Sequence, residues 1–119
     1  MEQYVDGFLL AVPKDKLGTY QGMATTACMV WKDHGALDYR ECVGDDLNMD
    51  PNCARFTDAA HAGDDEVVVF AWILYPSKAD RDRINAAVMA DPRLHCEEAE
   101  GVFDMKRMAW SGFRTLVAM

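Results

Sequence analysis

The feature that most limits the possible fold of this chain occurs twice: an apolar segment, a proline, and then a helical repeat. The first apolar segment, YVDGFLLAV, covers residues 4–12 and is followed by Pro13. The second, EVVVFAWILY, covers residues 66–75 and is followed by Pro76. Both segments are rich in β-formers, and proline ends a strand because it lacks the N–H that a sheet needs. Each half of the chain is therefore predicted to begin with a strand followed by a helix.

Further signals complete this pattern in each half. Apolar residues three or four apart predict a helix from Leu17 to about Trp31, and Gly35 should end it. Ser77 is placed to cap a second helix over residues 78–89. Two more strands are predicted over residues 36–43 and 106–117. The acidic segment between the halves, residues 44–65, is expected to be mostly loop, although ARFTDAA could add a short strand.

The predicted order of elements is β-α-β-β-α-β. This order is typical of an α+β, ferredoxin-like fold, in which a four-stranded antiparallel sheet carries two helices on one face. A chain of 119 residues has the length of one domain. We therefore expect residues 1–119 to form a single domain.

The strand predicted over residues 66–75 is apolar on both of its faces. One face carries Val67, Val69, Ala71, Ile73 and Tyr75, and the other carries Val68, Phe70, Trp72 and Leu74. The two helices can cover only one face, so the other face needs a different partner. The simplest partner is the same sheet of a second copy. We therefore predict a homodimer in which two sheets pack together.

The charge of the chain argues against two classes of partner. Twenty acidic and 12 basic residues give a formal net charge of −8, which repels the phosphates of nucleic acids. The N-terminus has an acid where a signal peptide has basic residues, and no stretch approaches the roughly 18 apolar residues that span a bilayer. We expect a cytoplasmic protein that binds neither nucleic acid nor membrane. Its four cysteines are then expected to be reduced.

Motifs for metal binding are incomplete. DLNMDP at residues 46–51 begins like a calcium loop, but Pro51 stands where that loop needs glycine and Thr57 where it needs a bidentate glutamate. The three histidines stand in separate segments, and only His95 adjoins another possible ligand, Cys96. Side chains of adjacent residues diverge, so this pair lacks metal-ligand spacing. We predict no metal site and no cofactor.

Ionisable residues inside predicted strands are candidates for a function, because burying an unpaired charge is costly. Asp6 lies in the first strand, Glu41 in the second and Arg107 in the last. The first and last strands are neighbours in a ferredoxin-like sheet, so Asp6 could pair with Arg107 or Arg114. Such a pair would hold the sheet and the dimer in register, or it would hold an anion in a cleft. The sequence leaves both alternatives open.

Aromatic residues on the strands are a second group of candidates. Small-molecule pockets combine apolar walls with a few polar groups. The aromatic residues that could line such a pocket are Trp72, Trp110, Tyr4, Tyr39 and Phe113. Strand aromatics also commonly fill protein cores. The sequence therefore leaves two interpretations of these aromatic residues open, a pocket wall and a packed core.

Several segments together resemble the YbaA-like family, the bacterial domain of unknown function 1428. They are YVDGFLLAVP, EVVVFAWILYPSKADRD, MADPR and FDMKRMAWSGF, which follow in the same order and spacing. The resemblance implies membership of the dimeric α+β barrel superfamily, whose members include cofactor-independent monooxygenases, isomerases, haem enzymes and ligand sensors. It identifies no catalytic residue. The family pattern falls on Asp6, Glu41, Trp72, Tyr75, Pro76, Ser77, Lys78, Arg81, Asp82, Asp91, Pro92, Phe103, Asp104, Lys106 and Arg107.

Arg81 and Asp82 belong to this pattern, although exposed charges in one helical turn are easily replaced. Capping and solvation of the helix do not explain both of them. We expect the two charges to reach across the dimer or into a cleft.

Two classes of function fit these observations. The first is a small-molecule binder or a cofactor-independent enzyme that uses a cleft between sheet and helices. In this class Trp72 and Phe113 would wall the cleft, Asp6 or Glu41 would act as acid or base, and Arg107 would hold an anion. The second is a non-enzymatic dimeric interaction module, in which the buried charges only fix the register.

Overall fold

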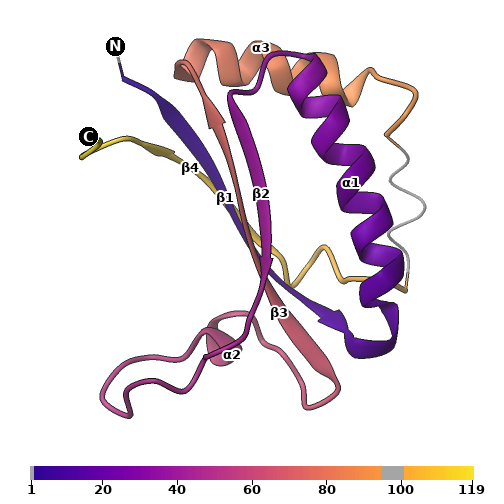
Figure 1. Ribbon diagram of the computed structural model, residues 1–119, viewed down its shortest axis with the longest axis vertical. Coiled ribbons are helices and arrows are strands. Elements are labelled where there is room, and N and C mark those ends of the chain that lie inside the picture. Colours follow the sequence, from indigo (N-terminus) through magenta and orange to yellow (C-terminus); the bar gives the residue numbers. More distant parts are fainter. Residues whose placement is uncertain (1, 95–100) are drawn as a thin grey trace.

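The computed structural model describes residues 2–94 and 101–119, and it confirms the α+β, ferredoxin-like fold (Figure 1). The strands are β1 (Tyr4–Pro13), β2 (Asp38–Val43), β3 (Glu66–Tyr75) and β4 (Ala109–Arg114). The helices are α1 (Leu17–Asp33), α2 (Phe56–Ala59) and α3 (Lys78–Met89), with a 3-10 turn η1 (Lys14–Lys16) before α1. His95 and Cys96 lie outside the described residues. In the described part of the chain, no helix is both long enough and apolar enough to cross a membrane.

The four strands form one antiparallel sheet in the order β2-β3-β1-β4. β1 and β3 occupy its centre and pair over their whole length, from Tyr4 opposite Tyr75 to Pro13 opposite Glu66. Helices α1 and α3 both lie on the same side of this sheet, as predicted (Figure 1). We call that side the covered face and the other side the open face.

Strand alternation divides the apolar side chains between these two faces. The covered face holds much of the core, with side chains at most 2% exposed at Leu10, Val12, Val69, Ile73 and Tyr75. They pack against residues of α1 and α3 that include Val30, Ile84 and Val88. The open face carries Val5, Leu9, Phe70, Trp72 and Phe113. Phe70 and Phe113 remain 45% and 57% exposed. The apolar character of both faces is thus confirmed, while α1 and α3 cover only one of them.

The helix ends follow the signals predicted from the sequence. After α1, Gly35 has a φ of +116°, and the N–H of Ala36 donates to the carbonyl of Trp31 at 3.0 Å. This is the Schellman arrangement that ends many helices, and it needs a residue that tolerates positive φ. At the start of α3, the Ser77 hydroxyl oxygen accepts a hydrogen bond from the N–H of Asp80 at 3.1 Å. Both helices therefore begin and end close to the predicted positions.

The ARFTDAA segment does not add a strand. It contains the one-turn helix α2, whose Phe56 packs edge to face with Phe70 at a centroid distance of 6.1 Å. Ala60, four residues later, is fully buried. Phe56 itself remains 49% exposed, so α2 contributes its ring to the surface beside Phe70.

The last strand is shorter than predicted, and it begins at Ala109 rather than at Lys106. The Asp104 carboxylate accepts a hydrogen bond from the N–H of Lys106 at 2.9 Å, and its carbonyl accepts one from the N–H of Arg107 at 3.0 Å. Aspartate commonly forms such turns, and the turn delays the start of the strand. Arg107 therefore precedes β4.

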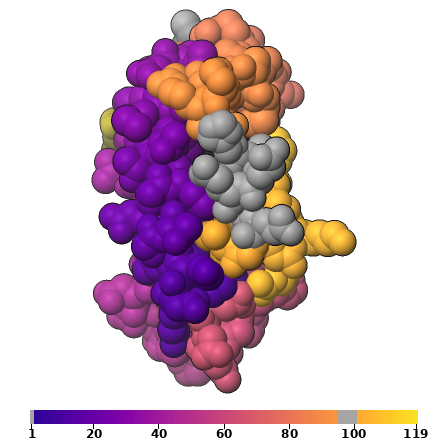
Figure 2. Space-filling model, turned by 90° about the vertical axis from the view of Figure 1, so that its right-hand side faces the viewer, coloured from indigo at the N-terminus to yellow at the C-terminus, as the bar shows by residue number. Residues whose placement is uncertain are grey.

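Residues 101–108, which lead into β4, lie beside α1 (Figure 2). Phe103 packs edge to face with Tyr20 of α1 at a centroid distance of 5.8 Å. Val102 is 5% exposed and packs with Leu10 and Val12 of β1. This segment thus bounds one side of the space between the sheet and α1.

Candidate ligand-binding site

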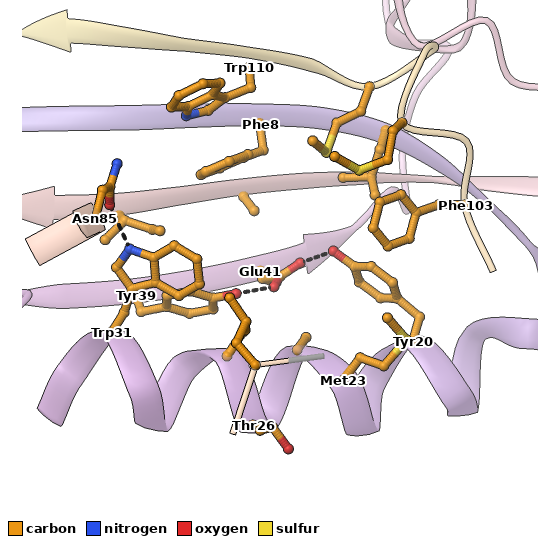
Figure 3. A pocket seen from close by; sticks show the side chains of 18 of the residues that line it. Phe8, Tyr20, Met23, Thr26, Trp31, Tyr39, Glu41, Asn85, Phe103 and Trp110 are labelled. Carbon is orange, nitrogen blue, oxygen red and sulfur yellow. Dashed lines mark hydrogen bonds between the residues drawn. The ribbon is translucent and has the colours of Figure 1, made fainter. Parts of the chain in front are cut away.

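A cavity of about 480 Å³ lies between the covered face and α1 (Figure 3). Its volume falls within the range of about 300–1,000 Å³ that is usual for small-molecule sites. Its aromatic walls are Phe8, Tyr20, Trp31, Tyr39, Phe103 and Trp110, and its methionines are Met23, Met89, Met105 and Met108. Among residues 2–94 and 101–119, no three His, Cys, Asp or Glu side chains lie close enough together to hold a metal ion.

Glu41 brings a carboxylate to the wall of this cavity. It stands opposite Ala71 in the pairing of β2 with β3, and both residues line the cavity from the covered face. The Tyr39 hydroxyl donates a hydrogen bond to Oε2 at 2.5 Å, and the Tyr20 hydroxyl donates a short hydrogen bond to Oε1 (Figure 3). Burial, reinforced by the charge of Glu41, raises the pKa of both hydroxyls. Both tyrosines therefore stay neutral near neutral pH and donate to the carboxylate.

Asp6 lies behind the cavity wall, with a side chain only 1% exposed. Its Oδ1 is 3.1 Å from Nε of Arg81, and its Oδ2 accepts hydrogen bonds from the Tyr75 hydroxyl at 3.0 Å and from Nδ2 of Asn85 at 3.3 Å. Asn85 in turn accepts a hydrogen bond from Nε1 of Trp31 at 3.0 Å. Asn85 and Trp31 line the cavity, so Asp6 supports the wall through them.

The predicted pairing of Asp6 with an arginine of the last strand is wrong. The residue of β4 opposite Asp6 is Gly112, and a Cβ atom at that position would collide with the Arg81 guanidinium and the Tyr4 hydroxyl. The missing side chain leaves room for Arg81, whose guanidinium carbon lies 4.9 Å from the centre of the Tyr4 ring. Arg81 thus reaches into the core of its own chain. Asp82, whose side chain is 58% exposed, stays at the surface, where its Oδ1 lies 2.8 Å from Nη1 of Arg81.

Arg107 does not line the cavity either. It donates hydrogen bonds of 2.9 and 2.7 Å to the two carboxylate oxygens of Glu66, and another of 2.9 Å to the carbonyl of His61. The hydrogen bonds from Arg107 to Glu66, with a further one from the N–H of Gly63, lower the pKa of Glu66 to about 2. Arg107 therefore connects the segment before β4 to the start of β3.

Trp72 and Phe113 lie on the open face, and the expectation that they wall a cleft between sheet and helices is wrong in its geometry. Trp72 follows Ala71 and precedes Ile73, both of which line the cavity, so alternation directs Trp72 to the opposite side. There the Arg40 guanidinium carbon lies 5.8 Å from the centre of its ring. Their candidate role in ligand binding is untested and stays a prediction.

Tyr20 and Asn85 are site residues that the sequence reasoning missed. Tyr39 and Trp110, two of the aromatic residues predicted as candidates for a pocket wall, do line the cavity, whereas Tyr4 does not. Asn85 lies four residues after Arg81 and therefore on the same side of α3. Tyr20 belongs to the apolar stripe of α1, and no local signal separates it from the core residues of that stripe.

Comparison with known proteins establishes the family. A family model described as a protein of unknown function (DUF1428) matches residues 3–105. The chain belongs to the DUF1428 family. Its relatives include the uncharacterized protein YbaA of Escherichia coli K12 and YbaA of Shigella flexneri, each 43% identical over 115 residues, with 97% of both chains covered. The family resemblance seen in the sequence is thus confirmed.

Solved structures share the fold of this DUF1428 protein at low sequence identity. A dimeric ferredoxin-like protein from an uncultured marine organism has a TM-score of 0.60 and 11% identity, covering 100% of this chain and 98% of that one. A NIPSNAP family protein with unknown function from Agrobacterium tumefaciens has a TM-score of 0.60 and 13% identity, covering 95% and 87%. At such identities the likeness shows the fold alone.

Proposed function

We propose that this DUF1428 protein binds a small, largely apolar molecule in the cavity between the covered face and α1, with Glu41 as its main polar contact. The observation that carries the proposal is a carboxylate on the wall of a cavity of about 480 Å³ that is otherwise lined mainly by aromatic, methionine and aliphatic side chains. Apolar walls with a few placed polar groups are typical of sites that bind small molecules.

Glu41 differs from the other charged residues that the sequence singles out. Asp6 and Arg107 each contact an opposite charge, and both lie off the cavity wall. The partners of Glu41 are two hydroxyls that line the same cavity, so three polar groups converge at one place. A bound molecule with a hydrogen-bond donor would occupy an oxygen lone pair that the tyrosines leave free. Glu41 is also the group that would act as acid or base on that molecule.

We further propose that the protein is a homodimer in which the open faces of two copies pack together. This proposal is supported by the aromatic residues of the open face, of which Phe70 and Phe113 are exposed and Trp72 is partly buried. It is also supported by the likeness of the fold to a solved protein described as dimeric. Packing two open faces together would remove these rings from water. The cavity lies on the covered face, so ligand binding and dimerisation would use different surfaces.

A thermal-shift screen with small aromatic and aliphatic compounds, both uncharged and charged, tests the binding proposal. A compound present at 100 times its Kd should raise the free energy of unfolding by about 2.7 kcal/mol. Ala27 lines the cavity from α1, so Ala27→Phe should fill the cavity and abolish the shift. Ala86 is exposed on α3 away from the cavity wall, so Ala86→Phe should keep it. No shift with any compound, or equal shifts in wild type and Ala27→Phe, would refute binding in this cavity.

A further inference from the structure

The negative charge of Glu41 faces the cavity without a counter-charge nearby. Among the residues that the structure describes, no Lys, Arg or His nitrogen lies within 4.0 Å of its carboxylate. The hydrogen-bond donors that it does have, Tyr20 and Tyr39, are neutral phenols. A carboxylate offers about four acceptor sites, so two donors leave room for more.

Arg93 supplies a positive charge at the cavity wall, but its guanidinium is already paired. Its Nη1 lies 2.7 Å from Oδ2 of Asp33, and its Nη2 lies 2.8 Å from Oδ2 of Asp91. Asp91 also contacts Nε2 of His34 at 2.9 Å. The carboxylates of Glu41, Asp33 and Asp91 outnumber the basic side chains of Arg93 and His34. Together with the net charge of −8, they make the surroundings of the cavity negative, which favours the approach of cations.

The aromatic walls favour the same sign of charge. The rings of Trp31 and Tyr39 lie 6.0 Å apart on one side, and those of Phe8 and Trp110 stack at 6.2 Å on the other (Figure 3). The faces of aromatic rings carry partial negative charge and attract ammonium groups. The same rings offer apolar surface to the rest of a ligand. An anionic ligand would be repelled by both the faces of the rings and the Glu41 carboxylate.

We propose that the molecule bound in this cavity is an organic ammonium ion, whose charged nitrogen donates to Glu41 while its apolar body lies among the aromatic walls. The inference rests on the proposed function and adds the chemical class of the ligand. An ammonium group carries up to three N–H donors and a positive charge. It would therefore supply Glu41 with further hydrogen-bond donors and with a counter-charge.

Three probes of similar size separate charge from shape: 2-phenylethylamine in its ammonium form, 2-phenylethanol, and 3-phenylpropanoate. Binding is followed by tryptophan fluorescence or by titration calorimetry. The wild-type protein should bind the ammonium about ten- to a hundred-fold more tightly than the alcohol, which is the scale of a hydrogen bond to a charged group. It should bind the carboxylate most weakly. Glu41→Gln should lower the affinity for the ammonium more than the affinity for the alcohol, so that the preference for the ammonium disappears.

Asp45→Asn is the matched control. It changes the net charge by the same amount at an exposed residue that does not line the cavity, so the preference should remain. If the ammonium binds no more tightly than the alcohol, or if Glu41→Gln keeps the preference, the ammonium proposal is wrong. Binding of the uncharged compounds, and its loss in Ala27→Phe, tests separately whether any ligand occupies the cavity. A protein that binds neutral compounds there without preferring the ammonium would keep the proposed function and lose only the inferred class of ligand.

Discussion

Arg81 of α3 and Asp6 of β1 form an ion pair inside the fold, with 3.1 Å between Nε of Arg81 and Oδ1 of Asp6. The side chains are 18% and 1% exposed, respectively. The two atoms do not meet the geometry of a hydrogen bond, so their contact is electrostatic. Because Asp6 lies on a central strand and Arg81 near the start of α3, the pair joins the helix to the middle of the sheet.

Removing Arg81 should destabilise the protein strongly. Arg81→Ala leaves the buried Asp6 carboxylate without its counter-charge, and the free energy of unfolding should fall by about 3–5 kcal/mol. Arg83→Ala on the same helix removes an ion pair with Asp80 in which Arg83 is 62% exposed, and it should cost about 1 kcal/mol or less. Urea unfolding of the two variants measures both effects. Equal losses would contradict a structural role for the Arg81–Asp6 pair.

Gly112 is needed because Arg81 occupies the space where its side chain would be. Gly112→Ala should destabilise the protein by about 1–3 kcal/mol, since the new methyl group would force Arg81 and Tyr4 to move. Gly22 lies inside α1 with no atom within 4 Å of the position that a Cβ would take. Gly22→Ala should therefore stabilise the protein by about 0.5–1 kcal/mol through helix propensity alone. Thermal unfolding that gave both variants the same sign would refute the explanation for Gly112.

The fold could be predicted because its signals act within a few residues of one another. Proline ends the strands, Ser77 caps α3, and Gly35 adopts the positive φ that ends α1. The start of β4 could not be predicted in the same way. There the Asp104 side chain forms a turn that competes with the strand, and only the structure reveals which of the two prevails.

The site could be predicted only in part, because it depends on how distant elements pack. Glu41 stands out as a charge within a strand. Both faces of β3 are apolar, however, so alternation alone does not tell which face lies under the helices, and Trp72 was expected on the wrong side. The contacts of Tyr20 with Glu41 and of Arg81 with Asp6 arise when α1 and α3 pack on the sheet. No local pattern encodes either contact.

The open face should mediate dimerisation. Replacing the 57% exposed Phe113 by Asp would place a charge in the proposed interface, so Phe113→Asp should convert a dimer into a monomer. Met29 of α1 is similarly exposed, at 53%, but it lies on a helix rather than on the open face, so Met29→Asp should leave the dimer intact. Analytical ultracentrifugation measures the masses. A wild-type monomer at micromolar concentration, or a dimeric Phe113→Asp, would rule out this interface.

The pair formed by Glu66 and Arg107 should make stability depend on pH in the acid range. Hydrogen bonds from Arg107 are the largest cause that lowers the pKa of Glu66 from 4.5 to about 2. A carboxyl group whose pKa is lowered in the folded state stabilises the fold above its unfolded pKa, and this contribution is lost as the pH falls through the folded value. Glu66→Gln should therefore cost about 1 kcal/mol at neutral pH, the scale of a partly exposed ion pair.

The difference in stability between wild type and Glu66→Gln should shrink as the pH falls from 4.5 to 2, because wild-type Glu66 then becomes protonated and neutral like glutamine. Urea unfolding of both proteins across this window measures the difference directly and cancels the acid sensitivity that they share. Glu2→Gln removes an exposed carboxylate that forms no ion pair within the described residues, so its small effect should not follow the same course. If the cost of Glu66→Gln were independent of pH, the carboxylate charge of Glu66 would contribute nothing to the stability of the fold.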